Sequence, residues 1–210
     1  MRVLYLHGFA SSPSSRKAQV FAERLRQAGA ECLVPALDGG DFASLTISGQ
    51  LALIEAAAGE GPVTLIGSSM GGYLAALYAA AHSSVEKIVL LAPAFGFARR
   101  WPLRLGPEVV AKWRADRSLE VFHYAAGELR RVGIELLDDG VRYPDFPAVT
   151  QPTLIFHGRN DDVVPYTFSQ EFQALRPQAE LHLFDSGHEL TDVLDPMWAL
   201  TADFLFGVRD

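Results

Sequence analysis

A serine that could act as a nucleophile lies at the boundary between an expected strand and an expected helix. The apolar run Val63–Ile66 leads directly into Gly67-Ser68-Ser69-Met70-Gly71-Gly72, after which helical spacing begins. A GxSxG pattern alone is a weak signal, but a strand-to-helix turn is the setting that exposes a serine hydroxyl. The N-terminus of the following helix directs free N–H groups at a developing negative charge. The pattern therefore predicts Ser69 as a nucleophile for acyl transfer and the Met70 N–H as an oxyanion donor.

The elements that would position this serine alternate along the chain. Helical spacing predicts helices around residues 18–25, 47–54, 70–81, 167–175 and 196–206. Short runs rich in apolar and β-branched residues predict six strands. These are Val3–Leu6, Cys32–Val34, Val63–Ile66, Ile88–Leu91, Thr153–Phe156 and Leu181–Phe184. The alternation predicts an α/β fold with a parallel, doubly wound sheet.

The alternation breaks once, because about 60 residues separate Leu91 from Thr153, far more than a crossover needs. We expect one domain over residues 1–210, with a cap inserted at about 96–150. A hairpin is expected near Leu119–Ile134, although residues 134–141 could equally form a helix. Four aromatic residues of the insertion are expected to roof the nucleophile, the alternative being that they only pack the cap onto the sheet. They are Trp101, Trp113, Phe122 and Tyr124.

The strand, the GxSxG turn and the helix together resemble the α/β-hydrolase family, in which an acid and then a histidine follow the nucleophile along the chain. The run His157-Gly158-Arg159-Asn160-Asp161-Asp162-Val163-Val164-Pro165 resembles that family's HGxxDxxVP loop. Asp185-Ser186-Gly187-His188 resembles its GH loop. The resemblance implies His188 as the base and Asp161 as the acid that orients it. It also implies a parallel sheet of order 2-1-3-4-5-6, with all three residues at the carboxyl ends of strands.

The N-terminal half carries a closer resemblance. Leu6-His7-Gly8-Phe9 resembles the family's HGx turn, which implies that the Phe9 N–H is the second oxyanion donor. The run from Leu6 to Ala18, together with residues 67–73, resembles the small YqiA-type esterases in particular. The insertion is longer than that subfamily leads us to expect, so its substrate range does not transfer.

Each of these residues has a simpler interpretation. Ser69 could be a helix cap, Asp161 a turn residue and His188 a surface histidine. All three in the required order at strand ends are far less probable by chance than as a catalytic set. The other five histidines are interpreted as structural, and of these His7 and His157 are expected to brace their turns.

Composition limits the other functional classes. The formal net charge of -7 disfavours a nucleic-acid partner, and no apolar run approaches the ~18 residues of a membrane span. The N-terminus lacks the pattern of a signal peptide, and the single Cys32 fits a buried strand, so we expect a cytoplasmic protein. No spacing suggests a metal site, and we expect no cofactor. Residues 96–150 hold nine of the 18 basic residues against eight acidic ones, either as a solvated face or as a means of attracting anionic substrates.

The sequence thus predicts a serine hydrolase that cleaves small-molecule carboxylic esters of short to medium acyl chains. An acyl thioesterase would use the same groups. A binding protein that has lost catalysis is a further alternative, although no member of the set is missing. The oligomeric state is left open.

Overall fold

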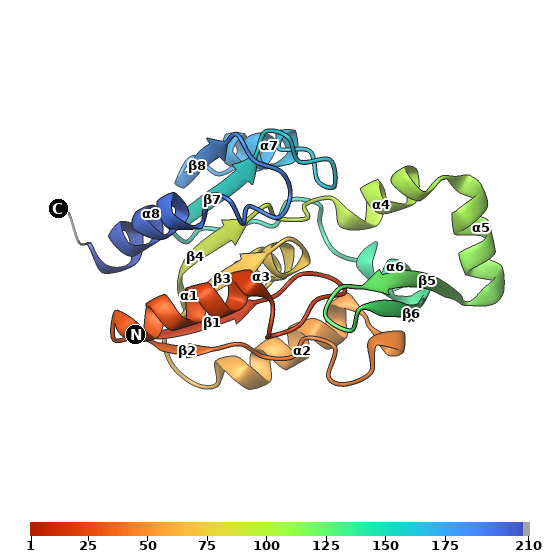
Figure 1. The fold of residues 1–210 in the computed structure, drawn as a ribbon, viewed down its shortest axis with the longest axis horizontal. Helices are drawn as coiled ribbons and strands as arrows, with labels where there is room; N and C mark the ends of the chain where they lie inside the picture. The colour runs from red at the N-terminus through yellow and green to blue at the C-terminus, as the bar shows by residue number, and fades with distance from the viewer. Residues whose placement is uncertain (208–210) are drawn as a thin grey trace.

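Six parallel strands form the central sheet of the protein, whose computed structural model describes residues 1–207 (Figure 1). The strands are β1 (Arg2–Leu6), β2 (Glu31–Leu33), β3 (Val63–Ser68), β4 (Val85–Leu91), β7 (Thr153–Gly158) and β8 (Ala179–Phe184). Their order is β2-β1-β3-β4-β7-β8, and every neighbouring pair is parallel. Counting only these strands, the order is the predicted 2-1-3-4-5-6. The α/β fold and its sheet order are confirmed.

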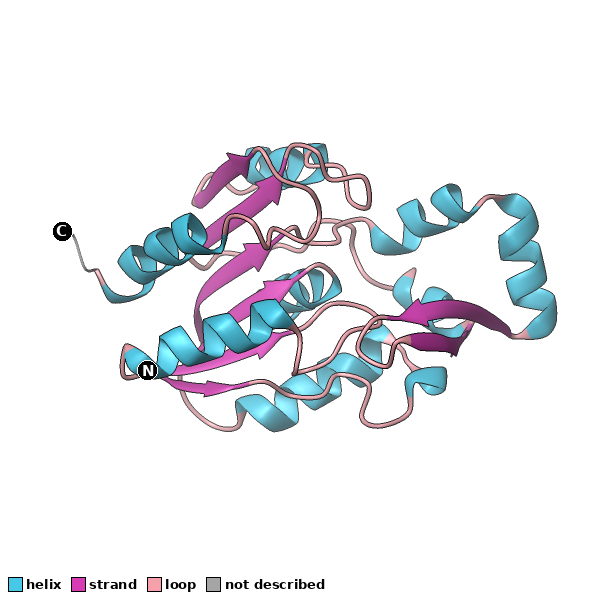
Figure 2. Cartoon of the chain, viewed as in Figure 1, coloured by secondary structure: helices cyan, strands magenta, loops and turns pink. Residues whose placement is uncertain are grey.

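Helices cover both faces of the sheet, as the figures show (Figures 1 and 2). The helices outside the insertion are α1 (Arg16–Gln27), α2 (Ile47–Ala58), α3 (Met70–Ala81), α7 (Thr167–Leu175) and α8 (Leu194–Phe206). Side chains of α1 and α8 pack with Val3 and Tyr5 on one face. Side chains of α2, α3 and α7 pack with Leu4 and Leu6 on the other. A short 3₁₀ helix, Phe42–Ser44, precedes α2.

The central strands are apolar because they are covered on both faces. All six residues of β3 and all six of β7 are buried, as expected for interior parallel strands. Register then aligns the ends of the strands, since Leu6 pairs with Gly67 and Ser68 with Leu91. The loops that follow β1, β3, β7 and β8 therefore meet at the carboxyl edge of the sheet.

The long connection between β4 and β7 contains the predicted hairpin and three helices. These are α4 (Phe97–Leu105), α5 (Pro107–Asp116), the antiparallel pair β5 (Ser118–His123) and β6 (Glu128–Gly133), and α6 (Glu135–Gly140). The hairpin and the helix that was its alternative at residues 134–141 are thus both present, one after the other. The sequence did not predict α4 and α5. We call residues 96–145 the inserted segment.

The inserted segment lies beyond the carboxyl ends of the strands and is closed at its base (Figure 1). The Gly96 N–H donates to the Asp145 carbonyl at 3.2 Å, and Arg99 forms an ion pair with the Asp145 side chain at 2.8 Å. At the turn between β5 and β6, the Tyr124 N–H donates to the Ala10 carbonyl at 2.9 Å. These contacts fix the inserted segment over the edge where the loops meet. Within residues 1–207, no helix is long and apolar enough to cross a membrane.

Candidate active site

Ser69 occupies a strained turn between β3 and α3. Its backbone has φ 54° and ψ -115°, a conformation that costs a non-glycine residue about 1–3 kcal/mol. The Ser69 N–H donates to the Leu91 carbonyl at 2.8 Å, which ties the turn to β4. A Cβ at Gly67 would lie 2.2 Å from the Gly71 carbonyl oxygen, and one at Gly71 would lie 2.1 Å from the Leu6 oxygen. Both positions therefore require glycine, which explains the motif around Ser69.

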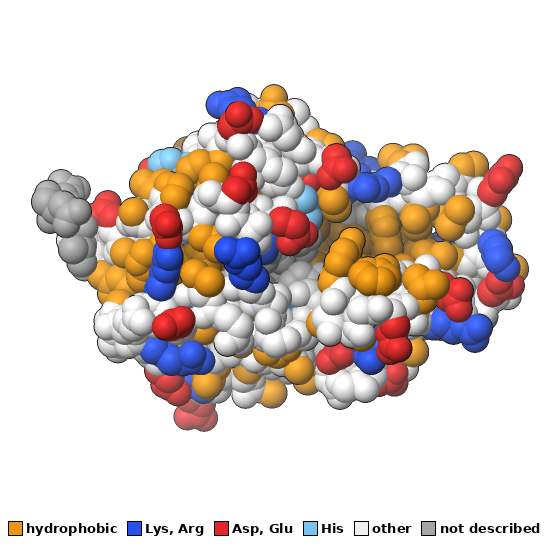
Figure 3. All heavy atoms as spheres, viewed as in Figure 1, with side chains coloured by type: hydrophobic (Ala, Val, Ile, Leu, Met, Phe, Trp, Pro, Cys, Tyr) orange, Lys and Arg blue, Asp and Glu red, His pale blue; other side chains and the backbone are white. Residues whose placement is uncertain are grey.

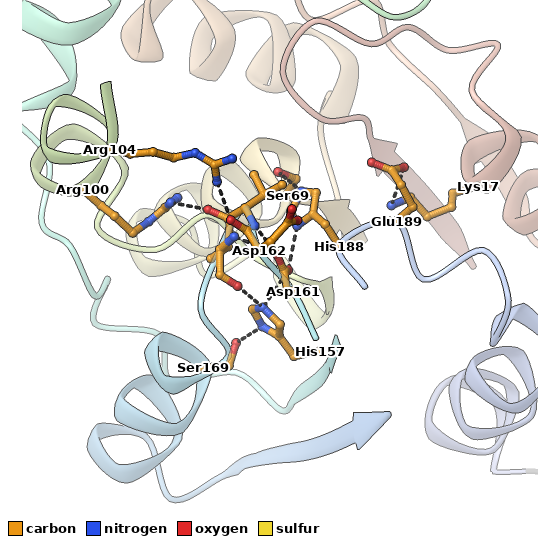
Figure 4. Close-up of polar contacts among 12 residues, drawn as sticks. Lys17, Ser69, Arg100, Arg104, His157, Asp161, Asp162, Ser169, His188 and Glu189 are labelled. Carbon is orange, nitrogen blue, oxygen red and sulfur yellow. Dashed lines mark hydrogen bonds and ion pairs between the residues drawn. The ribbon is translucent and has the colours of Figure 1, made fainter. Parts of the chain in front are cut away.

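The loops bring Ser69, His188 and Asp161 together, although they lie far apart in the sequence (Figure 4). His188 Nδ1 lies 2.7 Å from Asp161 Oδ2, and His188 Nε2 lies 3.1 Å from Ser69 Oγ. An ionised carboxylate can only accept, which assigns the imidazole proton to Nδ1. Nε2 is then free to accept from the Ser69 hydroxyl. This is the geometry of a nucleophile, a base and a group that orients the base.

The Asp161 carboxylate is held by its own loop. Its Oδ1 accepts the N–H groups of Val163 and Val164 at 2.8 and 2.7 Å, and its side chain is fully buried. Burial alone would raise the pKa of Asp161. Hydrogen bonds from His157, His188 and the loop backbone outweigh that effect and hold the pKa well below its usual range. Asp161 therefore stays ionised beside His188, whereas the side chain of neighbouring Asp162 is exposed.

His157 makes a second contact with Asp161 that the sequence did not reveal. Its Nε2 lies 3.1 Å from Asp161 Oδ2 and 2.9 Å from the Val164 carbonyl, both acceptors, so this nitrogen carries the proton. Its Nδ1 then accepts from the buried Ser169 hydroxyl at 2.8 Å. His157 was interpreted as bracing its turn, and it does contact that turn through Val164. It also donates to the carboxylate that orients His188.

The turn after β1 and the start of α3 both lie beside Ser69. A Cβ at Gly8 would lie 3.4 Å from Ser69 Cβ, and Phe9 and Met70 line the same cavity as Ser69. Within residues 1–207, neither the Phe9 nor the Met70 N–H donates to another backbone group. The predicted oxyanion donors are thus adjacent to Ser69 and unoccupied by internal partners.

His7 orients one of these donors. Its Nε2 accepts the Leu37 N–H at 3.2 Å, which leaves the proton on Nδ1 to donate to the Gly8 carbonyl at 3.0 Å. Burial lowers the pKa of His7 and favours this neutral form. Because a trans peptide is planar, holding the Gly8 carbonyl also fixes the direction of the Phe9 N–H. His7 therefore braces its turn as expected.

A cavity of about 900 Å³ opens beside Ser69 and His188. Apolar side chains gather around the hollow between the sheet and the inserted segment (Figure 3). Three of the four predicted roof residues line it: Trp101, Phe122 and Tyr124. The Trp101 ring also contacts the Phe9 ring edge-on, with centroids 5.1 Å apart. The inserted segment and the turn after β1 thus form one wall.

The expectation that Trp113 belongs to this roof has to be corrected. Its side chain is fully buried, its Nε1–H donates to the Val132 carbonyl at 3.1 Å, and it does not line the cavity. Its ring lies 5.2 Å from the ring of Trp101, nearly perpendicular to it. Trp113 therefore packs the inserted segment internally, which was the alternative for these aromatics, and supports Trp101 from behind.

The inserted segment also contacts the loop after β7, which carries Asp161. Arg100 donates to the Val163 carbonyl at 2.6 Å, and Arg104 donates to the Asp162 carbonyl at 2.7 Å (Figure 4). Both arginines come from α4, which the sequence did not predict, so these contacts could not be foreseen. Among residues 1–207, no group of three or more His, Cys, Asp or Glu side chains is arranged to hold a metal ion.

Comparisons with known proteins agree with this architecture. The mouse alpha/beta hydrolase domain-containing protein 10 has a TM-score of 0.83 at 19% identity, covering 99% of this chain and 90% of that chain. The Est1E structure from Butyrivibrio proteoclasticus with bound ferulic acid has a TM-score of 0.81 at 20% identity, covering 98% of this chain and 88% of that chain. At these identities the likeness concerns the fold.

Sequence comparison identifies the family. The AB hydrolase superfamily protein YisY of Bacillus subtilis (strain 168) is 31% identical over 158 residues, which span 59% of each protein. The chain therefore spans somewhat over half the length of this curated relative. The model of the family described as "Uncharacterised protein family (UPF0227)" matches residues 2–205. The chain, with its α/β-hydrolase fold, belongs to the UPF0227 family.

Proposed function

We propose that this protein is a serine hydrolase that cleaves carboxylic esters. The observation that carries the proposal is the continuous chain of contacts from Ser69 Oγ through His188 to the buried carboxylate of Asp161, at the edge of a cavity. The carboxylate of Asp161 stays ionised beside His188, as base-assisted attack requires. The strained turn at Ser69 adds support, because such strain clusters at functional sites.

The reaction proceeds in two halves on this geometry. His188 Nε2 takes the Ser69 proton as Oγ attacks the ester carbonyl, and the Phe9 and Met70 N–H groups stabilise the negatively charged oxygen. His188 then gives the proton to the departing alcohol, which leaves the acyl group on Ser69. Water, activated by the same imidazole, hydrolyses this acyl-enzyme and restores the serine. Asp161 stabilises the transient imidazolium throughout.

The inserted segment acts as a cap over Ser69 in a single α/β-hydrolase domain. This inference covers residues 1–210, with a cap at about 96–150; residues 208–210 lie outside those that the structure describes. The support is that α4 and the β5–β6 hairpin contribute apolar side chains to the cavity. An apolar wall favours acyl chains, and the short segment that builds it leaves room for short to medium chains.

Labelling with a fluorophosphonate probe tests the proposal. The probe should attach covalently to Ser69, located by peptide mass spectrometry, and Ser69→Ala should abolish labelling. Asp162→Asn serves as the control, since its exposed side chain makes no contact with His188, and it should label normally. Paired ester and thioester substrates then separate the two acyl chemistries. Absence of labelling in a folded protein, or faster turnover of the thioester, would overturn the assignment.

A further inference from the structure

The cavity beside Ser69 carries a charge opposite to that of the protein. Four basic side chains line it, Arg16, Lys17, Arg100 and Arg104, against one acidic side chain, Glu189. The chain as a whole has a formal net charge of -7. A cluster of one sign in a cleft concentrates ligands of the other sign. The lining therefore favours an anionic ligand in an otherwise acidic protein.

Lys17 is the most unusual of these residues because it is buried. It lies in the first turn of α1, and its side chain is only 9% exposed. Its one ion pair among the described residues is with Glu189, at 3.6 Å, beyond hydrogen-bond distance. The Glu189 side chain is 74% exposed and free to turn into solvent. Burial lowers the pKa of Lys17, and the negative charge of Glu189 offsets that effect only in part.

The wall around Lys17 supplies further hydrogen-bond donors. Hydroxyl side chains line the same cavity as Lys17: Ser11, Ser12, Ser14, Ser15 and Thr191. Ser15 precedes α1 but its side chain does not cap the helix, and the first turn of α1 contains no acidic residue. Hydroxyls, an ammonium and an unopposed helix start are all groups that favour an anion.

We propose that the wall around Lys17 binds a carboxylate of the substrate, so that the preferred substrates are esters carrying a second, ionised acid group. The inference rests on the proposed function, because Ser69 would cleave the ester in the same cavity. In Figure 4, Lys17 and Glu189 lie on one side of His188, and Arg100 and Arg104 lie on the other. The two arginines already donate to loop carbonyls, whereas the Lys17 ammonium has no hydrogen-bonded partner among the described residues. Lys17 is therefore the cation available to a ligand.

A purely structural role for Lys17 makes a different prediction. Glu189 follows His188 in the chain, so the only role of the ion pair could be to hold the loop after β8 that carries His188. In that case Glu189→Gln and Lys17→Met would impair every ester alike. If Lys17 binds the substrate carboxylate, Glu189→Gln removes a competing negative charge, and the preference for charged esters is kept or increased.

Hydrolysis of two matched esters distinguishes these roles. The half ester of adipic acid with 4-nitrophenol carries a carboxylate, and its methyl ester is a neutral compound of nearly the same shape. We expect kcat/KM to favour the half ester by about tenfold or more, as a charge-assisted hydrogen bond would give. Lys17→Met should remove that preference and leave the methyl ester within about threefold of the original protein. The same change at exposed Lys112, outside the cavity, is the charge-matched control and should keep the preference.

Binding to the Ser69→Ala protein tests the inference without catalysis. By titration calorimetry, monomethyl adipate should bind about tenfold more tightly than dimethyl adipate, and adding Lys17→Met should equalise them. Equal binding of the two compounds to the Ser69→Ala protein would overturn the carboxylate site while leaving the esterase proposal intact. A binding preference without hydrolysis of either ester would support the site and contradict the esterase. If Glu189→Gln and Lys17→Met each lowered hydrolysis of the half ester and of its methyl ester equally, the ion pair would serve only to hold the loop that carries His188.

Discussion

One oxygen of Asp161 serves both His188 and His157. Oδ2 lies 2.7 Å from His188 Nδ1 and 3.1 Å from His157 Nε2, while Oδ1 is occupied by backbone N–H groups. Both oxygens of the carboxylate therefore accept hydrogen bonds, and the group cannot rotate away from His188 without losing several of them.

The residues in direct line with Ser69 should differ in how much activity their loss removes. Ser69→Ala or His188→Ala should lower kcat by up to ~10⁶, and Asp161→Asn by ~10⁴, because an amide leaves the imidazole in the wrong tautomer. Asp162→Asn should be nearly silent, since its exposed side chain does not contact His188. Steady-state kinetics on a 4-nitrophenyl ester measure all four. If the Asp162 change were damaging and the Asp161 change tolerated, the acid that orients His188 would be Asp162 and not Asp161.

His157 should act through Asp161 rather than on the substrate. Removing its donor in His157→Leu should lower kcat by about 10- to 100-fold, the value of a hydrogen bond to a charged group, with KM nearly unchanged. His157→Gln, which retains an N–H, should recover part of the loss. A loss of stability alone would not produce that split between kcat and KM in the folded protein.

His182→Leu provides the matched control for that measurement. This histidine pairs with Glu180 on β8 and has no contact with Asp161. Its replacement should alter kcat by less than about twofold. Equal effects at His182 and His157 would argue against a positioning role for His157.

The depressed pKa of Asp161 should make its contribution to stability depend on pH. A carboxyl group whose folded pKa lies below the unfolded value, near 3.9, stabilises the fold fully above that value and loses the effect as pH falls toward the folded pKa. The free energy of unfolding of the original protein should therefore exceed that of Asp161→Asn most at neutral pH. The difference should shrink below about pH 4. Urea titrations across this range, with Asp162→Asn as control, measure it; a difference that grows on acidification would contradict the prediction.

Acyl-chain preference should reflect the roof. An apolar wall contributes about 0.8 kcal/mol per buried CH₂ until the space is filled, so kcat/KM should rise from 4-nitrophenyl acetate and then fall within short to medium chains. Trp101→Ala should move the optimum to longer chains, because Trp101 lines the cavity between Phe9 and Phe97. Trp198→Ala, on α8 and outside the cavity, is the control. A clear preference of the unmodified protein for the palmitate ester would contradict the proposal that the apolar wall limits the length of the acyl chain.

The framework of the fold could be predicted because its signals are local. Buried parallel strands are continuous apolar runs, and the glycines around Ser69 mark a turn that larger residues cannot make. Strand ends differ from the predictions by a few residues, as at Val85, where β4 begins before the apolar run Ile88–Leu91.

The inserted segment and the support of Asp161 could not be predicted in the same way. Pro102 lies inside α4, and Gly106 lies between α4 and α5, which begins at Pro107. Proline and glycine usually end helices, so this stretch does not read as helical from the sequence. The contact of His157 with Asp161 depends on how a loop folds back, which no periodicity encodes. The burial of Trp113 likewise depends on which side of the segment faces inward.

The hydrogen bond between Gly96 and Asp145 has an evolutionary consequence. Because the two ends of the inserted segment meet at its base, changes in the residues between them need not displace β4 or β7. Loops mounted on a rigid scaffold are where proteins diversify their specificity. Changes in this one stretch of sequence would therefore reshape the wall of the cavity, while Ser69, Asp161 and His188 all come from outside it.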